Sequence, residues 1–311
     1  MTRLSIAIPS KGRLKEKSED WLSASGFKLR QKGGGRGYSA ELKGLPDADI
    51  MLLSAREISE ELIAGNLHIG ITGEDLLHDL SNAFDQEVQV MRRLGFGGAD
   101  VIVAVPASWL DVETMSDLEA AGALFRQRHG RRMRVATKYL KLTRQFFAEK
   151  AVGEYRLIES PGATEAAGTA EVIVDITSTG STLKANDLKV LDDGVILESE
   201  ASLVGSLRAN WTPESLKTLE VFSDSIEATV SARERVRIES DIAIPESIFQ
   251  TFKLTRVSDH IALCVSQNAS SAARALAKVG AKTVTIATIN QAFSSDNAVF
   301  ANFVKNLSRS A

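Results

Sequence analysis

Short apolar runs alternate along the first two thirds of the chain with longer stretches in which apolar residues recur every three or four positions. The runs have the length of buried strands and cover residues 4–8, 67–72, 100–106, 133–137 and 171–176. The stretches with helical spacing cover residues 11–25, 54–64, 116–121, 141–150 and 182–188. This alternation predicts an α/β fold with mainly parallel sheets.

Two local signals fix the bounds of predicted helices. Ser54 stands three residues before Glu57, the spacing of a capping box, so a helix is expected to begin there. Gly26 follows the first helical stretch and is expected to end it as a C-terminal cap.

The pattern changes near residue 208. Thr212 and Pro213 are typical of a helix start, and apolar residues at helical spacing then continue to about residue 232. Further strands are predicted at 236–242, 260–265 and 283–289, and further helices at 245–252, 270–279 and 297–307. We therefore predict a small α+β module from residue 209 to 311.

Charge and cysteine content narrow the class of protein. The formal net charge is −3, and the densest basic cluster, residues 126–132, is interpreted as a solvated loop, so no nucleic-acid partner is expected. Cys264 is the single cysteine and lies in an apolar run, which fits a buried thiol in a reducing compartment. No apolar run approaches the roughly 18 residues of a membrane span, and the first one is a strand rather than a signal peptide. We expect a cytoplasmic protein without a membrane partner.

The segment 171–184 carries the strongest chemical signal. An apolar strand ends in Asp175, and a short loop rich in hydroxyl groups leads into a helix. Backbone amides and hydroxyls of such a loop can bind a phosphate, and a carboxylate beside it can reach ribose hydroxyls. An ordinary capped turn remains the alternative for the loop alone. The loop residues are Thr177, Ser178, Thr179, Gly180, Ser181 and Thr182.

Other strand ends carry polar groups as well. Lys11 and Arg13 follow the first strand, where cations suit a polyanion, although a solvated helical turn is an equal alternative. Glu165 precedes Asp175 by ten residues and could share a diol with it, or could be a surface acid. Two more strands end in a similar way, at Gly73, Glu74 and Asp75 and at Thr137 and Lys138. The four histidines lack metal-ligand spacing.

Five segments together resemble the ATP phosphoribosyltransferase family of histidine biosynthesis. They are Ile8-Pro-Ser-Lys-Gly-Arg-Leu14, Leu67-His-Ile-Gly-Ile-Thr-Gly-Glu-Asp75, Arg93-Leu-Gly-Phe-Gly97, Val135-Ala-Thr-Lys-Tyr139 with Thr143-Arg144, and Asp175-Ile-Thr-Ser-Thr-Gly-Ser-Thr-Leu-Lys-Ala-Asn186. The resemblance implies a two-lobed catalytic region similar to type II periplasmic binding proteins. Its first lobe would comprise residues 1–95 and 190–208, and its second lobe residues 96–189.

The resemblance also implies an activity and a site. The enzyme would transfer 5-phosphoribosyl from phosphoribosyl pyrophosphate (PRPP) to N1 of ATP with release of pyrophosphate, the first step of histidine biosynthesis, with Mg²⁺ on the substrates. The loop 177–182 would bind the PRPP 5-phosphate, and Asp175, Glu165 and Lys11 would be catalytic. The residues facing ATP or pyrophosphate would be Lys11, Arg13, Gly73, Glu74, Asp75, Thr137 and Lys138.

The resemblance also bears on regulation and on nucleotide binding. Residues 209–311 look like a divergent ACT or ferredoxin-like extension that binds histidine, with one strand short or missing near residues 255–258. A homo-oligomer, from dimer to hexamer, and a regulatory subunit related to histidyl-tRNA synthetase are both implied by the family. Many relatives carry arginine where this chain has Ser54, and Arg56 is a candidate to replace it.

Two other classes remain open at this point. A binding protein of periplasmic type without catalysis would explain two lobes and a phosphate loop, but not the convergence of Asp175, Glu165 and the cations. A purine or pyrimidine phosphoribosyltransferase usually has two adjacent acids before its loop, whereas Ile176 follows Asp175 here.

Overall fold

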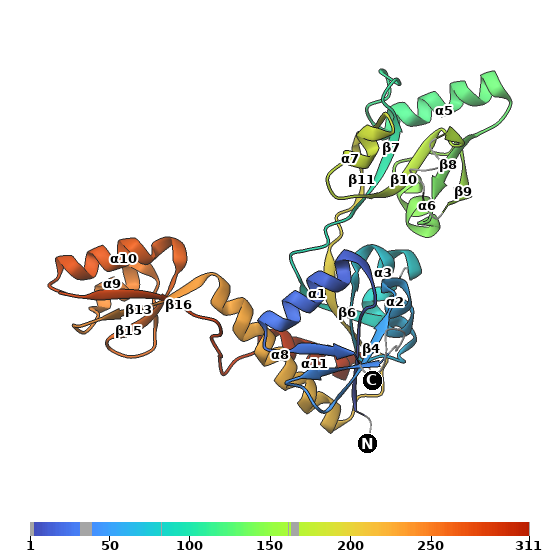
Figure 1. Cartoon of the computed structure of the whole chain (residues 1–311). Coiled ribbons are helices and arrows are strands. Elements are labelled where there is room, and N and C mark those ends of the chain that lie inside the picture. Colours follow the sequence, from blue (N-terminus) through green and yellow to red (C-terminus); the bar gives the residue numbers. More distant parts are fainter. Residues whose placement is uncertain (1–2, 32–38, 82, 161, 163–167, 311) are drawn as a thin grey trace.

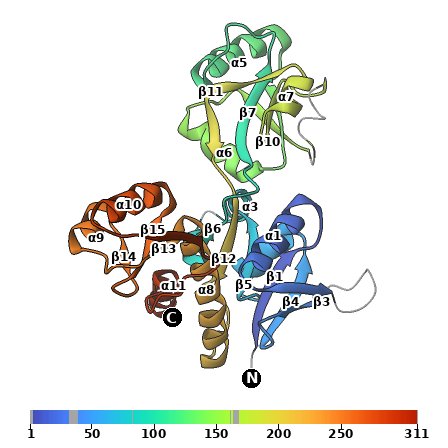
Figure 2. The same cartoon turned by 60° about the vertical axis from the view of Figure 1, so that its left-hand side comes forward.

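The computed structural model describes residues 3–31, 39–81, 83–160, 162 and 168–310. They form two α/β lobes joined by two crossing segments, with a third, smaller α+β unit beside the first lobe (Figures 1 and 2). Two lobes crossed twice are the arrangement of type II periplasmic binding proteins, as the resemblance implied. Within the described residues, no helix is long and apolar enough to span a membrane.

Lobe I is built on a seven-stranded sheet in the order β2-β3-β4-β1-β5-β12-β6. Its strands are β1 Leu4–Pro9, β2 Lys28–Gln31, β3 Ser39–Lys43, β4 Ala48–Leu53, β5 Ile69–Gly73, β6 Val88–Arg93 and β12 Ala201–Ser206. Its helices within this part of the chain are α1 Gly12–Ala24, α2 Ala55–Ala64, α3 Glu74–Leu80 and α4 Phe84–Glu87. Buried side chains of α1 join the core on one face of the sheet, and those of α2 and α3 join the core on the other.

Lobe II is built on a five-stranded sheet in the order β11-β7-β10-β8-β9. Its strands are β7 Asp100–Pro106, β8 Met133–Thr137, β9 Tyr155–Glu159, β10 Val172–Thr177 and β11 Leu188–Leu197. Its helices are α5 Met115–His129, α6 Leu140–Glu149 and α7 Ser181–Ala185. The strand β11 pairs with β7, although much of β11 falls within the stretch 190–208 that the resemblance assigned to the first lobe.

Both sheets are mixed, so the prediction of mainly parallel sheets was wrong. Strand β1 lies parallel to β4 and β5, and β8 lies parallel to β9 and β10. The strands that carry the chain toward or away from the other lobe run against these: β12 is antiparallel to β5 and β6, and β7 is antiparallel to β10 and β11. The two crossings between lobes therefore account for much of the antiparallel pairing.

The predicted capping box at Ser54 is confirmed, since its hydroxyl accepts from the Glu57 amide at 3.2 Å and the Glu57 carboxylate accepts from the Ser54 amide at 2.7 Å. The interpretation of residues 126–132 as a loop was wrong for its first half. Arg126, Arg128 and His129 form the last turn of α5, where cations oppose the partial negative charge of a helix end.

The C-terminal region begins with a long helix and contains the small unit between its first and last helices. Its elements are α8 Pro213–Arg233, β13 Arg235–Ser240, α9 Glu246–Phe252, β14 Thr255–Arg256, β15 Ile261–Val265, α10 Ser266–Lys278, β16 Val284–Thr288 and α11 Ala298–Ser310. From β13 to β16 the order is β-α-β-β-α-β, and the sheet order β14-β15-β13-β16 is ferredoxin-like. The strand expected to be short is β14, which has two residues.

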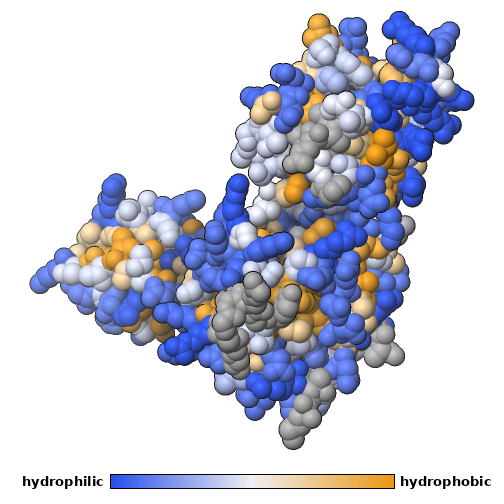
Figure 3. Space-filling view, turned by 45° about the vertical axis from the view of Figure 1, so that its right-hand side comes forward, coloured by the Kyte–Doolittle hydropathy of each residue, from blue (hydrophilic) through white to orange (hydrophobic). Residues whose placement is uncertain are grey.

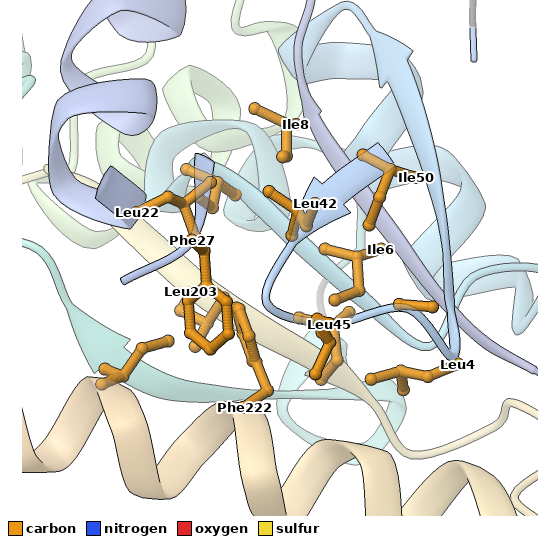
Figure 4. Close-up of a cluster of buried hydrophobic side chains, with 14 of the residues drawn as sticks. Leu4, Ile6, Ile8, Leu22, Phe27, Leu42, Leu45, Ile50, Leu203 and Phe222 are labelled. Atoms are coloured by element: carbon orange, nitrogen blue, oxygen red, sulfur yellow. The ribbon is translucent and has the colours of Figure 1, made fainter. Parts of the chain in front are cut away.

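The helices α8 and α11, which flank this unit in sequence, lie against lobe I. Phe222 of α8 packs on Phe27 with ring centroids 5.1 Å apart, and both belong to the main core of lobe I (Figure 4). Phe303 of α11 is fully buried in the same core, over Gly205 of β12. The ferredoxin-like unit is therefore attached to lobe I through a helix at each end.

Removing the Phe303 ring tests this attachment. We expect Phe303→Ala to lower the free energy of unfolding by about 3–5 kcal/mol, because it leaves a cavity over Gly205. Urea denaturation measures the change. The control is Phe293→Ala, whose ring is 64% exposed and whose loss should cost less than about 0.5 kcal/mol. Equal effects of the two substitutions would contradict the buried position of α11.

Candidate active site

A cleft of about 490 Å³ lies between the two lobes and is lined by both. Lobe I contributes residues from α1, α2 and the start of α3, and lobe II contributes the ends of β8 and β10. The crossing segments supply Gly97, Gly98, Ala99 and the first residue of β12. Figure 3 shows one face of the molecule, on which hydrophilic residues predominate and hydrophobic residues form smaller patches.

The parallel strands explain why these groups meet. In each lobe the carboxyl ends of neighbouring parallel strands lie at one edge of the sheet, which is where ligands bind in open α/β folds. Residues after β1, β4 and β5 reach the cleft from lobe I, and residues after β8 and at the end of β10 reach it from lobe II. The cleft thus combines the two edges.

The hydroxyl-rich loop 177–182 lies at the lobe II edge. Ser178 and Thr179 line the cleft, and both are exposed. The Gly180 amide donates to the Thr177 hydroxyl at 2.9 Å, and Gly180 has φ +69°, a conformation that favours glycine. The hydroxyls of Thr179 and Ser181 are 3.1 Å apart. Ser181 and Thr182 are exposed residues of α7 and do not line the cleft.

Asp175 is half-buried near the end of β10. One of its carboxylate oxygens accepts from the Ile176 amide at 2.8 Å. Strand β10 pairs in parallel with β8, and Val174 lies opposite Thr137. Asp175 and Lys138 are the next residues along these two strands. Lys138 lines the cleft. Thr137 is fully buried, and its hydroxyl accepts from the Tyr139 amide at 2.9 Å, which makes it part of the turn.

The turn after β5 carries two carboxylates, those of Glu74 and Asp75, which have different hydrogen-bond partners. Glu74 is buried and pairs with Arg93 through two bonds of 2.8 Å, while Ser202 donates to it at 2.7 Å. The hydrogen bonds that Arg93 donates to Glu74, together with the charge of Glu74, raise the pKa of Arg93. Gly73 and Asp75 line the cleft, but Glu74 is not among the residues that do so.

Asp75 is buried between the lobes. Its two carboxylate oxygens accept from the Tyr139 hydroxyl at 2.6 Å and from the Ser199 hydroxyl at 3.1 Å. Burial raises the pKa of Tyr139, and the charges of Asp75 and then Asp175 act in the same direction. A neutral phenol that donates to a carboxylate is the stable form of this pair.

The first helix supplies cations. Arg13 and Lys17 both line the cleft, one helical turn apart on α1. Lys11 is exposed and is not among the lining residues. The neighbouring Ser10 amide donates to the Leu53 carbonyl at 2.8 Å, so Lys11 lies near the start of α2.

Ser54 is the cap of α2, and Ala55 beside it lines the cleft. Arg56 pairs with Glu60 at 3.1 Å and lies 3.9 Å from Asp79. Its guanidinium is therefore held on the α2–α3 side, and it is not among the residues that line the cleft.

Glu165 lies outside the described residues. Two residues that line the cleft, Lys17 and Tyr139, were not predicted from the sequence as site residues. Lys17 could have been found from its spacing of four from Arg13, which places both on one face of a helix. Tyr139 offered no signal of its own, because its partner Asp75 lies 64 residues away.

A larger groove of about 1200 Å³ lies between α4, β6 and α11. Arg208, Trp211, Asn306 and Arg309 are among its lining residues. It is remote from the loop 177–182 and from the strand ends that carry the predicted chemistry, so the smaller interlobe cleft is the better candidate active site.

Comparisons with known proteins agree with the resemblance. The sequence model of the ATP phosphoribosyltransferase family matches residues 54–227. An ATP phosphoribosyltransferase of Caulobacter vibrioides is 46% identical over 98% of both chains. One of Rhodopseudomonas palustris (strain BisB18) is 50% identical over 76% of this chain and 74% of its own.

A solved structure is similar as well. It is the ATP phosphoribosyl transferase (HisG:HisZ) complex from Thermotoga maritima, with a TM-score of 0.54 and 25% identity. The match covers 72% of this chain and 98% of the Thermotoga chain. A substantial part of the present chain thus has no counterpart in that one.

The turn at Gly73 gives a test of the site's packing. A Cβ on Gly73 would lie 2.2 Å from Oδ1 of Asp75, so Gly73→Ala should displace that carboxylate and cost about 1–3 kcal/mol of stability. The control is Gly98→Ala in the same cleft, where a Cβ would meet no atom of the described chain within 4 Å. Urea denaturation of both variants measures the change in the free energy of unfolding. If Gly73→Ala left that free energy unchanged, the turn would not be tightly packed.

Proposed function

This chain belongs to the ATP phosphoribosyltransferase family, and from that premise we propose which groups of the interlobe cleft hold its two substrates. The activity is transfer of 5-phosphoribosyl from PRPP to N1 of ATP, with release of pyrophosphate, as the first step of histidine biosynthesis. Both substrates are polyanions, so the assignment follows the amides, hydroxyls and cations of the cleft.

The loop 177–182 binds the 5-phosphate of PRPP. It is short and exposed, and its turn is fixed by the bond from the Gly180 amide to the Thr177 hydroxyl. Backbone amides and the hydroxyls of Ser178 and Thr179 are then the donors for a phosphate. The helix α7 has five residues, so its dipole adds little and the loop itself must provide the binding. This loop at the edge of the cleft is the observation that carries the proposal.

Asp175 holds the ribose of PRPP. It is half-buried two residues before the loop, so a sugar whose phosphate sits on the loop has its hydroxyls near this carboxylate. Glu165 is the proposed second carboxylate for the ribose diol. A charged acceptor for ribose hydroxyls also places negative charge beside C1, where oxocarbenium character develops.

Arg13, Lys17 and Lys138 hold the pyrophosphate of PRPP and the triphosphate of ATP. They reach the cleft from both lobes, Arg13 and Lys17 from α1 and Lys138 after β8. Lys11, which the family places at this site, lies at the start of the same helix and is proposed to bind at the rim. Glu74 and Asp75 hold protein partners, so we assign them to shaping the turn around Gly73.

The reaction is a displacement at C1 of the ribose, in which adenine N1 attacks as pyrophosphate leaves. The protein's contribution is to hold the two substrates in line, so that the reaction between two polyanions becomes effectively unimolecular within the bound complex. Fixed amides and cations stabilise the charge of the leaving pyrophosphate.

Magnesium is assigned to the substrates. Across the part of the chain that the structure describes, no three His, Cys, Asp or Glu side chains are grouped to hold a metal ion. We propose that Mg²⁺ is carried by the phosphates of PRPP, where it would neutralise charge on the leaving group.

The ferredoxin-like unit is proposed to bind histidine and to regulate the enzyme. Its double attachment through α8 and α11 gives a physical route to the core of lobe I. A regulatory subunit related to histidyl-tRNA synthetase is a second possibility for regulation, because the Thermotoga maritima structure is a HisG:HisZ complex. A homo-oligomer is also expected of this chain.

The carboxylate of Asp175 gives the direct test of the site. We expect Asp175→Asn to lower kcat/KM for PRPP by about 100-fold or more, since a charge near the developing cation is lost. The measurement is ultraviolet absorbance of the N1-alkylated adenine, with ATP, PRPP and Mg²⁺. The control is Asp187→Asn, twelve positions further on, where φ is 50° and asparagine is well tolerated. Near-normal turnover by Asp175→Asn would refute the assignment.

Histidine binding tests the regulatory proposal. We expect histidine to reduce the initial rate and to slow amide hydrogen exchange within residues 235–288 of the full-length protein. Mass spectrometry of exchanged peptides, with and without histidine, measures this. Protection confined to the interlobe cleft, or none at all, would contradict a histidine site in the ferredoxin-like unit.

A further inference from the structure

Helix α3 of lobe I makes a buried contact with lobe II at the edge of the cleft. The Tyr139 hydroxyl of lobe II donates to one oxygen of Asp75 at 2.6 Å. The other oxygen of Asp75 accepts from Ser199, in the segment that crosses between lobes, at 3.1 Å. The Asp75 amide donates back to the Ser199 hydroxyl at 3.0 Å. One carboxylate therefore joins lobe I, lobe II and the crossing segment.

The same face of α3 makes further contacts one turn later. Burial raises the pKa of Asp79, while Arg56 and the amides of Leu142 and Lys141 at the start of α6 oppose that rise. The Lys141 ammonium donates to the Leu80 carbonyl at 2.7 Å. Between these polar contacts, Leu76 packs against the apolar core of lobe II. Since Asp75 and Asp79 are four residues apart, they present one helix face to α6.

The contact between α3 and lobe II also lies beside the proposed substrate site. Tyr139 follows Lys138, which lines the cleft, and its amide is bonded to Thr137 at the end of β8. The position of Lys138 relative to Gly73 and α1 therefore depends on where the Tyr139 hydroxyl is held. Loss of that bond would free one edge of the cleft to move away from the other.

We propose that Tyr139 and Asp75 are positioning residues: their bond latches lobe II onto lobe I and so sets the distance between the two halves of the substrate site. This proposal rests on the proposed function, because it assigns the two halves to the two substrates. It gives Asp75 a role different from binding ATP or pyrophosphate.

The latch has a kinetic signature that distinguishes it from a contact with one substrate. Both substrates bind between the lobes, so each has its apparent affinity lowered by the fraction of molecules in the competent arrangement. Removing the latch should then raise both KM values by a similar factor. A residue that touches only PRPP or only ATP would change one KM value.

The first test removes the hydrogen bond by replacing Tyr139 with phenylalanine, which lacks only the hydroxyl group. We expect Tyr139→Phe to raise KM for ATP and for PRPP together by about tenfold, the scale of a lost hydrogen bond to a carboxylate, with kcat within about twofold. Tyr155→Phe is the matched control: it is the same change in lobe II, where the ring packs on Phe147, and it should leave both KM values unchanged. A change in one KM value alone, or in neither, would overturn the proposal.

A double substitution isolates the pair. Asp75→Ala should reproduce the equal rise of both KM values, and Tyr139→Phe added to it should cause no further change, because the two residues act through one bond. Additive effects would show that the residues act independently. Asp75→Asn retains an acceptor for the Tyr139 hydroxyl and should restore most of the affinity.

Lobe geometry can be measured without activity. Spin labels on Ser23→Cys in α1 and Gln127→Cys in α5, both exposed positions, report the interlobe distance, while the native Cys264 is buried. In the absence of substrates, Tyr139→Phe should broaden or shift that distance distribution relative to the wild type and to Tyr155→Phe. An unchanged distribution would overturn the latch. If the wild type formed no product, the proposed function would fail, and the distances would still decide on the latch.

Discussion

The geometry of the cleft depends on the hydrogen bonds that the buried carboxylate of Asp75 accepts. It accepts from Tyr139 of lobe II and from Ser199 of the crossing segment, and it follows Gly73, where a side chain would collide with it. A buried carboxylate without partners would be costly, so folding favours the arrangement in which both hydroxyls reach it. That arrangement brings the strand ends of one lobe opposite those of the other.

The two edges have complementary chemistry. Lobe II offers a loop of hydroxyls and amides with Asp175 before it, and lobe I offers cations on the first helix. In the proposed assignment, lobe II holds a sugar phosphate and lobe I holds a polyphosphate, so that the two meet between the lobes. The proposed mechanism has no covalent intermediate and relies on positioning of the substrates and on charge stabilisation. The ferredoxin-like unit stands outside the cleft and is joined to lobe I through α8 and α11 (Figures 1 and 2).

Local patterns predicted much of this fold, and long-range pairing accounts for what they missed. The capping box at Ser54 and the helix start at Thr212 depend on neighbouring residues, so the sequence sufficed. Strand direction depends on where the chain crosses between lobes, so the mixed sheets were not foreseen. The site shows the same division: the loop 177–182 was visible as a motif, whereas the burial of Glu74 against Arg93 and the bond from Tyr139 to Asp75 arise only on folding.

A crystal structure of the protein with PRPP and a non-reacting ATP analogue would test directly how the cleft holds its substrates. We predict that the 5-phosphate accepts hydrogen bonds from the backbone of residues 177–182, that the ribose hydroxyls contact Asp175, and that the Tyr139–Asp75 hydrogen bond persists. A PRPP molecule found in the groove beside Arg208 and Arg309, with the loop 177–182 free of phosphate, would contradict it.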